Sequence, residues 1–307
     1  MQQKIDMTVD LGGIRMKNPV AVASGTFGYG QEYTGLVDVT RLGAITVKGI
    51  RLREWPGNPL PRHVEVPGGM LNAIGLQGPG VDGFVRDHMP FLRTTGVPVI
   101  VNIWGIDIDE YVEVARRLSD VEGVAGLELN ISCPNVKEGG SAFGTDPRVV
   151  ASLVAAVRRA TALPLMPKLA PNVPDIKVFV RAAQDAGADA LSMINTLPAM
   201  AIDIDSRRPV LANKVGGLSG SAIHPVAVKL VWEAAQVARI PILAMGGIMG
   251  SEQAIEFMLA GAAAVAVGTA NFIDPAICLR VIEGIESYVL RHGLVSVSGL
   301  TGAVICD

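Results

Sequence analysis

The stretch AGADALSMINT, residues 186–196, carries the pattern that decides the fold. Its glycine ends a helical segment, and an apolar run typical of a strand begins immediately afterwards. Related phrases occur as LGAITV at 42–47 and AGAAAV at 260–265. Glycine and alanine are common residues, so the repetition alone is weak evidence. Its place at equivalent helix-to-strand joints nevertheless indicates repeated βα units.

Eight short apolar runs of this kind are spaced along the 307 residues. They lack polar–apolar alternation, as expected for a parallel sheet that is covered on both faces. The runs occupy residues 19–24, 44–48, 98–102, 126–130, 164–168, 190–195, 241–246 and 264–268. Helical patterns lie between them and no linker interrupts the series. We therefore predict an α/β fold in which residues 1–307 form a single (β/α)8 TIM-barrel domain.

A doubly wound open sheet is the alternative fold for such a series of strands and helices. An open sheet normally has fewer strands than this sequence predicts. No Gly-x-Gly-x-x-Gly turn, which would bind a dinucleotide in such a sheet, follows an early strand. The barrel is therefore the preferred prediction.

Three helix starts are marked by capping residues. Asp146 precedes Pro147, the arrangement favoured for an N-cap residue followed by a proline in the first turn. We expect a second helix to begin at Asp274-Pro275, and Ser251 to cap a third. These signals predict helices after the loops that follow three of the strands.

Two connections are longer than a βα unit requires, residues 49–97 and residues 196–224. In a barrel both leave from the C-terminal face, where active sites form. Long loops at such a place are usually lids or binding segments. We therefore predict extended loops on the C-terminal face that cover a functional site.

The composition limits the classes of partner. Half of the residues are hydrophobic and 18% are charged, which supports a large core rather than disorder. A net charge of −3 provides no basic footprint for nucleic acid or for an anionic membrane surface. No uninterrupted apolar run is long enough to span a bilayer, and the start lacks the features of a signal peptide.

The cysteines and histidines give no sign of a metal site. Three widely spaced cysteines suit a reducing compartment, so we predict a cytoplasmic protein. Three thiols cannot supply the four ligands that an iron–sulfur cluster usually needs. The four histidines are scattered without metal-ligand spacing, and we expect no bound metal.

Polar residues gather where the predicted strands end. A buried strand end is an unfavourable place for lysine or asparagine unless partners satisfy the polar atoms. Any one of these residues could be a local cap or an ion-pair partner. So many at one end of one barrel indicate the lining of a site for a polar, planar ligand. The residues are Ser24, Lys48, Asn102, Asn130, Lys168, Asn195 and Thr196.

The last two strands end in the glycine-rich turns MGGI (245–248) and VGTANF (267–272). Such turns expose backbone N–H groups beside helix N-termini, where many barrels hold a phosphate. Two tight turns without a phosphate are the alternative explanation. A phosphate site together with Lys168 favours flavin mononucleotide (FMN), because a cation near the N1–O2 edge stabilises the anionic reduced flavin. Pyridoxal phosphate also uses a lysine, but it would leave the asparagines unexplained.

Cys133 lies in LELNISCPNV (127–136), directly after the fourth strand. A thiolate on a loop above a bound ring system could act as a general base. Nucleophilic catalysis would need an activating histidine, and none lies in this loop. An inert cysteine near a strand end is the alternative. With a ligand site predicted beside it, we favour the role of a base.

A set of motifs resembles the catalytic subunit of class 1B dihydroorotate dehydrogenases. The motifs stand in that family's order, as SGTFGYG (24–30), NAIGLQGPG (72–80), NISCPN (130–135), INTLPAM (194–200), GGLSG (216–220), MGGI (245–248) and VGTANFIDP (267–275). The resemblance implies one FMN per chain and the oxidation of (S)-dihydroorotate to orotate in pyrimidine biosynthesis. Two local departures, GPG at 78–80 and Trp104 in VNIWG, touch no implied catalytic residue.

The resemblance also implies the roles of individual residues. Cys133 would remove the C5 proton while hydride passes from C6 to flavin N5, and Lys48 would contact both flavin and substrate. The implied FMN-binding residues are Ser24, Lys48, Gly49, Asn102, Asn130, Lys168, Ile194, Gly220, Gly246, Gly247, Gly268 and Thr269. The implied substrate-binding residues are Lys48, Asn72, Ala73, Ile74, Gly75, Leu76, Asn130, Asn195 and Thr196.

The subclass determines the electron acceptor. The resemblance implies a partner subunit that carries FAD and a [2Fe-2S] cluster and passes electrons to NAD+, with a homodimeric core inside a heterotetramer. The fumarate-dependent class 1A is the alternative, and its motifs match less well at 24–30 and 72–80.

A flavin barrel of the dihydropyrimidine dehydrogenase type and a non-catalytic flavin-binding scaffold are further alternatives. The presence of Cys133, Lys48 and Lys168 argues against the scaffold.

Overall fold

A closed barrel of eight parallel strands forms the centre of the computed structural model, which describes residues 5–131 and 144–306. The strands are hydrogen-bonded in the order β10-β15-β16-β3-β4-β7-β8-β9. Their bounds are β3 Val20–Val22, β4 Ala44–Ile50, β7 Val99–Ile103, β8 Val124–Asn130, β9 Leu165–Lys168, β10 Leu191–Met193, β15 Ile242–Ala244 and β16 Ala264–Val267. Each overlaps one predicted apolar run. The predicted TIM barrel is confirmed, and the open sheet is wrong.

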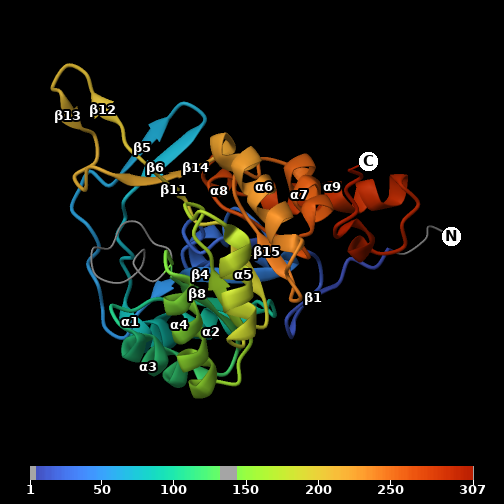
Figure 1. The fold of residues 1–307 in the computed structure, drawn as a ribbon, viewed down its shortest axis with the longest axis horizontal. Helices are drawn as coiled ribbons and strands as arrows, with labels where there is room; N and C mark the ends of the chain where they lie inside the picture. Colours follow the sequence, from blue (N-terminus) through green and yellow to red (C-terminus); the bar gives the residue numbers. More distant parts are fainter. Residues whose placement is uncertain (1–4, 132–143, 307) are drawn as a thin grey trace.

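Helices cover the outside of the barrel (Figure 1). Neighbours along the chain pack side by side, α3 on α4, α4 on α5, α5 on α6 and α6 on α7. The α-helices are α1 Gly80–Asp87, α2 Met89–Thr94, α3 Ile108–Ser119, α4 Pro147–Ala160, α5 Ile176–Asp185, α6 His224–Ala235, α7 Ser251–Ala260, α8 Ala270–Ile273 and α9 Ile277–Arg291. Short 3-10 turns occupy Gln31–Tyr33, Val39–Arg41, Ser221–Ile223 and Val297–Leu300.

The predicted helix starts are only partly right. Asp146 caps α4, because its carboxylate accepts the backbone N–H of Arg148 at 2.8 Å. Ser251 does not cap α7: it is the first helical residue, and Gly250 holds the cap position without a side-chain hydrogen bond. The helix expected at Asp274-Pro275 begins later, at Ile277. Asp274 instead ends the short helix α8, which the sequence pattern did not separate from α9.

A hairpin closes the N-terminal end of the barrel. It consists of β1 (Val9–Leu11) and β2 (Ile14–Met16). Leu11 joins the same buried cluster as the inward-facing Ile100 and Met166 of the barrel strands. A Cβ on Gly12 would lie 2.2 Å from the backbone oxygen of Asp189, just before β10. The hairpin therefore sits directly against the strand starts and leaves the opposite end for a site.

The two long connections pair with each other in an antiparallel sheet of order β11-β14-β6-β5. The strands are β5 His63–Val66 and β6 Gly69–Asn72 from the first connection, and β11 Leu197–Ala199 and β14 Gly216–Ser219 from the second. Figure 1 shows this sheet together at one side of the molecule, with the hairpin of β12 (Ile202–Asp203) and β13 (Arg208–Pro209) projecting beyond it. The predicted extended loops are thus organised as a second, small sheet.

The N-terminal segment contacts the segment that follows α9. The backbone N–H of Asp6 donates to the carbonyl of Val295 at 3.0 Å, and that of Val297 donates to Asp6 at 2.9 Å. Figure 1 shows both ends on the same side of the molecule. In the described part of the chain, no helix combines the length and the apolar character that crossing a membrane would require.

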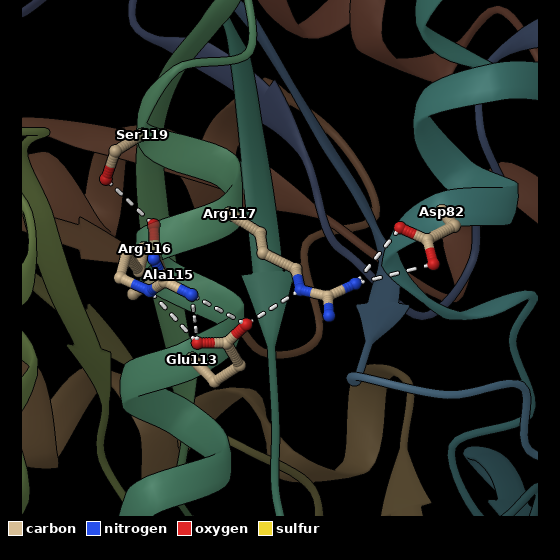
Figure 2. Close-up of polar contacts among 6 residues, drawn as sticks. All are labelled: Asp82, Glu113, Ala115, Arg116, Arg117 and Ser119. Atoms are coloured by element: carbon tan, nitrogen blue, oxygen red, sulfur yellow. Dashed lines mark hydrogen bonds and ion pairs between the residues drawn. The ribbon is translucent and has the colours of Figure 1, made fainter.

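Helix α3 carries an exposed ion-pair cluster that reaches α1 (Figure 2). Glu113 pairs with Arg116 and with Arg117, each at 2.8 Å, and Arg117 also lies 3.2 Å from Asp82 of α1. Asp82 is 81% exposed, so water and salt screen this bridge and it stabilises the fold only slightly. The buried faces of the two helices therefore contribute most of their attachment.

Candidate functional site

A cavity of about 430 Å³ opens at the C-terminal ends of the barrel strands, with the small sheet as one wall. Nearly all residues predicted for flavin and substrate line it: Ser24, Lys48, Gly49, Asn72, Ile74, Gly75, Leu76, Asn102, Asn130, Lys168, Ile194, Asn195, Thr196, Gly220, Gly246, Gly247, Gly268 and Thr269. Ala73 is an exception, because its side chain is fully buried in a cluster with Leu71 of the small sheet and Leu211. Cys133 lies outside the described residues.

The lining residues divide between opposite arcs of the barrel. Asn130 and Lys168 end the adjacent strands β8 and β9, and Asn102 is the last residue but one of the neighbouring strand β7. The glycine turns follow β15 and β16, which lie across the barrel from β7 and β8 in the closed strand order. A ligand bound here would meet amides and an ammonium group at one end and backbone N–H groups at the other. The strand order therefore favours an elongated ligand with two different polar ends.

Three asparagines at the strand ends form a directional row of hydrogen bonds, which we call the asparagine row. The Nδ2 of Asn195 donates to Oδ1 of Asn130, and the Nδ2 of Asn130 donates to Oδ1 of Asn102, both at 3.3 Å. The Nδ2 of Asn102 then donates to Oε1 of Glu128 at 2.6 Å. At the other end, the backbone N–H of Thr196 donates to Oδ1 of Asn195 at 2.8 Å. The row thus ends on a carboxylate below the cavity.

Glu128 is fully buried inside the barrel, one inward-facing position before Asn130 on β8. Besides the amide of Asn102, it accepts the hydroxyl of Ser192 at 2.5 Å. The Nζ of Lys168 lies 3.8 Å from Oε1 of Glu128. A carboxylate that is removed from water is costly unless such partners surround it. Glu128 is therefore the counter-ion beneath the lysine that lines the cavity.

The turn after β15 is built for close approach of the backbone. Gly247 has a φ of +70°, a conformation that glycine adopts most readily. A Cβ there would lie 2.7 Å from the Cβ of His224 and 2.8 Å from the carbonyl oxygen of Gly220. In the turn after the neighbouring strand β16, the hydroxyl of Thr269 donates to the hydroxyl of Ser219 at 2.8 Å. These contacts pack the turn tightly, so a side chain at position 247 would have to displace its neighbours.

Behind Lys48 and Gly49, the continuation of β4 is held by a buried ion pair. Arg51 donates from Nε and Nη2 to both carboxylate oxygens of Glu110 at 2.8 and 3.0 Å. Its guanidinium also lies over the rings of Trp55 at 4.9 Å and Trp104 at 4.8 Å. Trp104 thus packs on this ion pair rather than lining the cavity.

The sequence analysis missed two buried residues beneath the cavity and some of the residues that line it. Glu128 was treated as part of the apolar run GLELN, although a charged residue two positions before Asn130 points to the same face of a strand. Ser192 was missed for the same reason, since it lies inside the run ALSMIN. Other lining residues, such as His63 and Met70, lie in the first long connection, which was predicted to cover a site, but no local pattern singled them out individually.

The donor set fits FMN. Lys168 and the asparagine row can face the oxygen and nitrogen edge of an isoalloxazine ring, and the glycine turns and Thr269 can bind a phosphate. The apolar side chains of Ile194 and Met245 line the cavity as well. A volume of this size falls in the range of about 300–1,000 Å³ that is usual for cofactor sites. Among the described residues, no group of three His, Cys, Asp or Glu side chains could hold a metal ion.

Comparison with known proteins gives one consistent result. The sequence profile of the family described as dihydroorotate dehydrogenase matches residues 6–289. The chain is 54% identical over 302 residues to the dihydroorotate dehydrogenase B (NAD(+)) catalytic subunit of Geotalea uraniireducens, covering 98% of this chain and 99% of the relative. It is also 54% identical over 303 residues to the protein of the same name from Pelobacter propionicus, covering 99% and 100%. The corresponding protein of Geobacter sulfurreducens is 53% identical over 302 residues, covering 98% and 99%.

Proposed function

This chain belongs to the dihydroorotate dehydrogenase family, and on that premise we propose that it is the FMN-binding catalytic subunit of an NAD+-linked enzyme that oxidises (S)-dihydroorotate to orotate for pyrimidine biosynthesis. The observation that carries the proposal is the convergence of Lys48, Asn72, Asn130, Lys168 and Asn195 on one cavity. These residues come from distant parts of the sequence. They were assigned to flavin and substrate from the sequence alone.

FMN would occupy the length of the cavity. The backbone N–H groups of the Gly246–Gly247 and Gly268–Thr269 turns would hold the phosphate. Lys168, Asn102 and Asn130 would face the polar edge of the ring, with Lys168 placed to compensate negative charge there. When bound, FMN supplies the acceptor for the hydride that leaves C6 of the substrate.

The substrate would lie between the ring and the small antiparallel sheet. Asn72 at the end of β6, together with Asn130 and Asn195, offers amides that can both donate to and accept from a pyrimidine ring. Lys48 offers an ammonium group for the carboxylate and lines the same cavity. Amides fixed in one orientation would bind one face of the substrate and place its C5 and C6 hydrogens reproducibly.

Cys133 would remove the C5 proton. Its thiolate would act as a general base from the segment that follows β8, directly after the cavity residue Asn130. We expect Cys133→Ala and Cys133→Ser to retain FMN but to slow its reduction by dihydroorotate at least about 100-fold. Unchanged reduction in both variants would contradict this role.

The relatives are named as catalytic subunits of a NAD(+) enzyme, which supports a partner for this chain. We propose a cytoplasmic heterotetramer with a homodimer of this chain, folded as a single domain over residues 1–307, at its core. Its partner subunit would carry FAD and a [2Fe-2S] cluster and deliver electrons to NAD+. The cysteines of this chain are too few to ligate such a cluster.

Anaerobic titration of the FMN-loaded protein with dihydroorotate tests the proposal. We expect stoichiometric bleaching of the flavin by dihydroorotate and none by dihydrouracil. Reoxidation by NAD+ should need a co-purifying subunit. Bleaching by dihydrouracil would indicate a dihydropyrimidine dehydrogenase type of activity, and reoxidation of the isolated chain by fumarate would indicate class 1A. Absence of bleaching by either dihydropyrimidine would contradict the proposed function.

A further inference from the structure

We propose that Glu128 is a positioning residue that sets the orientation of the asparagine row and thereby the hydrogen-bonding pattern that the cavity presents to its ligands. This inference rests on the proposed function for the identity of the ligand, but its structural basis lies in the chain itself. Glu128 lies below the cavity and is not among its lining residues. It would therefore act through its neighbours rather than by touching substrate or cofactor.

The first step concerns Asn102. A side-chain amide can be turned so that either its oxygen or its nitrogen faces a given neighbour. An ionised carboxylate only accepts hydrogen bonds, so Asn102 must present its NH2 group to Glu128, at 2.6 Å. Its Oδ1 is then fixed on the other side. The register of the parallel strands β7 and β8 places Asn102 directly opposite Glu128. The barrel itself therefore imposes this contact.

The second step extends the orientation along the row. Because Oδ1 of Asn102 is an acceptor, Asn130 must turn its NH2 group toward it, at 3.3 Å. The Oδ1 of Asn130 then accepts from Nδ2 of Asn195, also at 3.3 Å. The orientation of each amide thus fixes the orientation of the next. Without a charged end the hydrogen bonds of the row could run in either direction, and the carboxylate of Glu128 selects one of them.

The third step concerns charge. Ser192 donates to the second carboxylate oxygen at 2.5 Å, and Lys168 lies 3.8 Å from the first. A hydroxyl can either donate or accept, so Ser192 adapts to Glu128 and does not determine its orientation. Glu128 and the side chain of Lys168 are almost completely removed from water, and their charges therefore interact strongly. A neutral residue at position 128 would leave Lys168 without this counter-ion and Asn102 without a fixed acceptor.

Glu128→Gln tests the inference because it keeps the shape of the side chain but can offer either an oxygen or an NH2 group to Asn102. Two matched variants accompany it. Ser192→Ala removes a hydrogen bond from the same carboxylate but leaves the bond from Asn102 in place. Glu110→Gln makes the same chemical change in another buried carboxylate, which pairs with Arg51 and does not line the cavity.

Orotate affinity, measured from the change it causes in the absorbance of bound FMN, is the first readout. We expect Glu128→Gln to weaken orotate binding about 10-fold or more, and the two control variants to change it less than about 3-fold, with FMN retained in all three. Wild-type affinity in Glu128→Gln would overturn the inference. Equal weakening in Ser192→Ala would also overturn it, because the loss would then reflect any damage to the buried cluster. A wild-type protein that does not bind orotate would instead contradict the proposed function.

A second measurement needs neither a variant nor a ligand. Neutron diffraction from crystals of the deuterium-exchanged wild-type protein distinguishes the nitrogen from the oxygen of each side-chain amide. We expect deuterium on Asn102 facing Glu128, and deuterium on Asn130 facing Asn102. An Asn102 or Asn130 amide in the reverse orientation, or a protonated Glu128 that donates to Asn102, would overturn the inference even if Glu128→Gln does not fold.

Discussion

The ring Nδ1 of His224 lies 3.0 Å from the carbonyl oxygen of Gly246, which ties the start of α6 to the glycine turn after β15. The other ring nitrogen lies 2.6 Å from a carboxylate oxygen of Glu256 on α7. The ring also meets Phe257 edge-on, with 5.0 Å between ring centroids. One side chain therefore links three elements around the turn that we propose for the phosphate of FMN.

Replacing His224 by alanine should loosen this turn without unfolding the barrel. We expect His224→Ala to bind FMN about 10-fold more weakly, the effect of losing one well-formed hydrogen bond at the edge of a site. Fluorescence quenching of FMN by the apoprotein measures the affinity. His292→Ala is the matched control, because its Nδ1 lies 2.9 Å from the carbonyl of Tyr288 at the exposed end of α9. Equal weakening in both variants would contradict the assigned role of His224.

The Gly246–Gly247 turn should be intolerant of a side chain. Gly247→Ala adds a Cβ at a φ of +70° and within 2.8 Å of Gly220 and His224, so the turn must shift. We expect FMN affinity to fall more than about 10-fold, since strain of this kind costs on the order of 1–3 kcal/mol. Gly96→Ala has a similar φ of +64° but no atom within 4 Å, so it isolates the cost of the backbone conformation. FMN affinity in Gly247→Ala equal to that of Gly96→Ala would show that the close approach is unimportant.

Cys278 should be unreactive in the folded protein. Burial raises the pKa of the Cys278 thiol to about 12, and the thiol donates to Oδ1 of Asn271 at 3.4 Å. The neutral thiol therefore predominates at pH 8, and the nucleophilic thiolate is scarce. We expect iodoacetamide at pH 8 to label the exposed Cys306 in the native protein and Cys278 only after unfolding, as read by peptide mass spectrometry. Labelling of native Cys278 at the rate of Cys306 would contradict its burial.

The buried and exposed ion pairs should differ sharply in their effect on stability. Glu110→Ala removes the partner of Arg51, whose side chain is only 11% exposed, and leaves an uncompensated charge. We expect the free energy of unfolding in urea to fall by about 3–5 kcal/mol. Arg117→Ala, in the exposed cluster of Figure 2, should change it far less. A similar fall in the free energy of unfolding of both variants would contradict the argument that solvent screens the exposed ion pair more strongly than the buried one.

The charge on Asp146 should support helix α4 only above acidic pH. Hydrogen bonds from the side chain and backbone N–H of Arg148 lower the pKa of Asp146 to about 2. The pKa of Asp146 in the folded protein lies below its value of about 3.9 in the unfolded chain. The charge therefore makes its full contribution to the stability of the fold at neutral pH. It is lost as the pH falls from about 4 toward 2.

Asp146→Asn keeps a good N-cap but removes the charge. We expect a lower melting temperature than wild type at pH 7, and a difference that narrows as the pH falls from about 4 toward 2, as measured by scanning calorimetry. A difference that stays constant or widens over this range would show that the charge is not responsible.

Local pattern predicted much of the architecture. The eight barrel strands could be read from apolar runs because a parallel strand that is covered on both faces buries every residue. The cap at Asp146 could be read because its hydrogen bond reaches only two residues along the chain. The predicted cap at Ser251 was wrong, since the same residue type fits both the cap and the first turn, and the local sequence does not decide between them.

Sequence by itself determined the barrel, its family and the polar residues at the strand ends that line the cavity, because these depend on short motifs at the ends of strands. Only the tertiary structure decided how those residues work together. Glu128 meets Asn102 and Ser192 across 26 and 64 residues of sequence, and His224 meets Gly246 across 22. Such contacts follow from the closure and register of the barrel, which bring strand ends together irrespective of their separation along the chain.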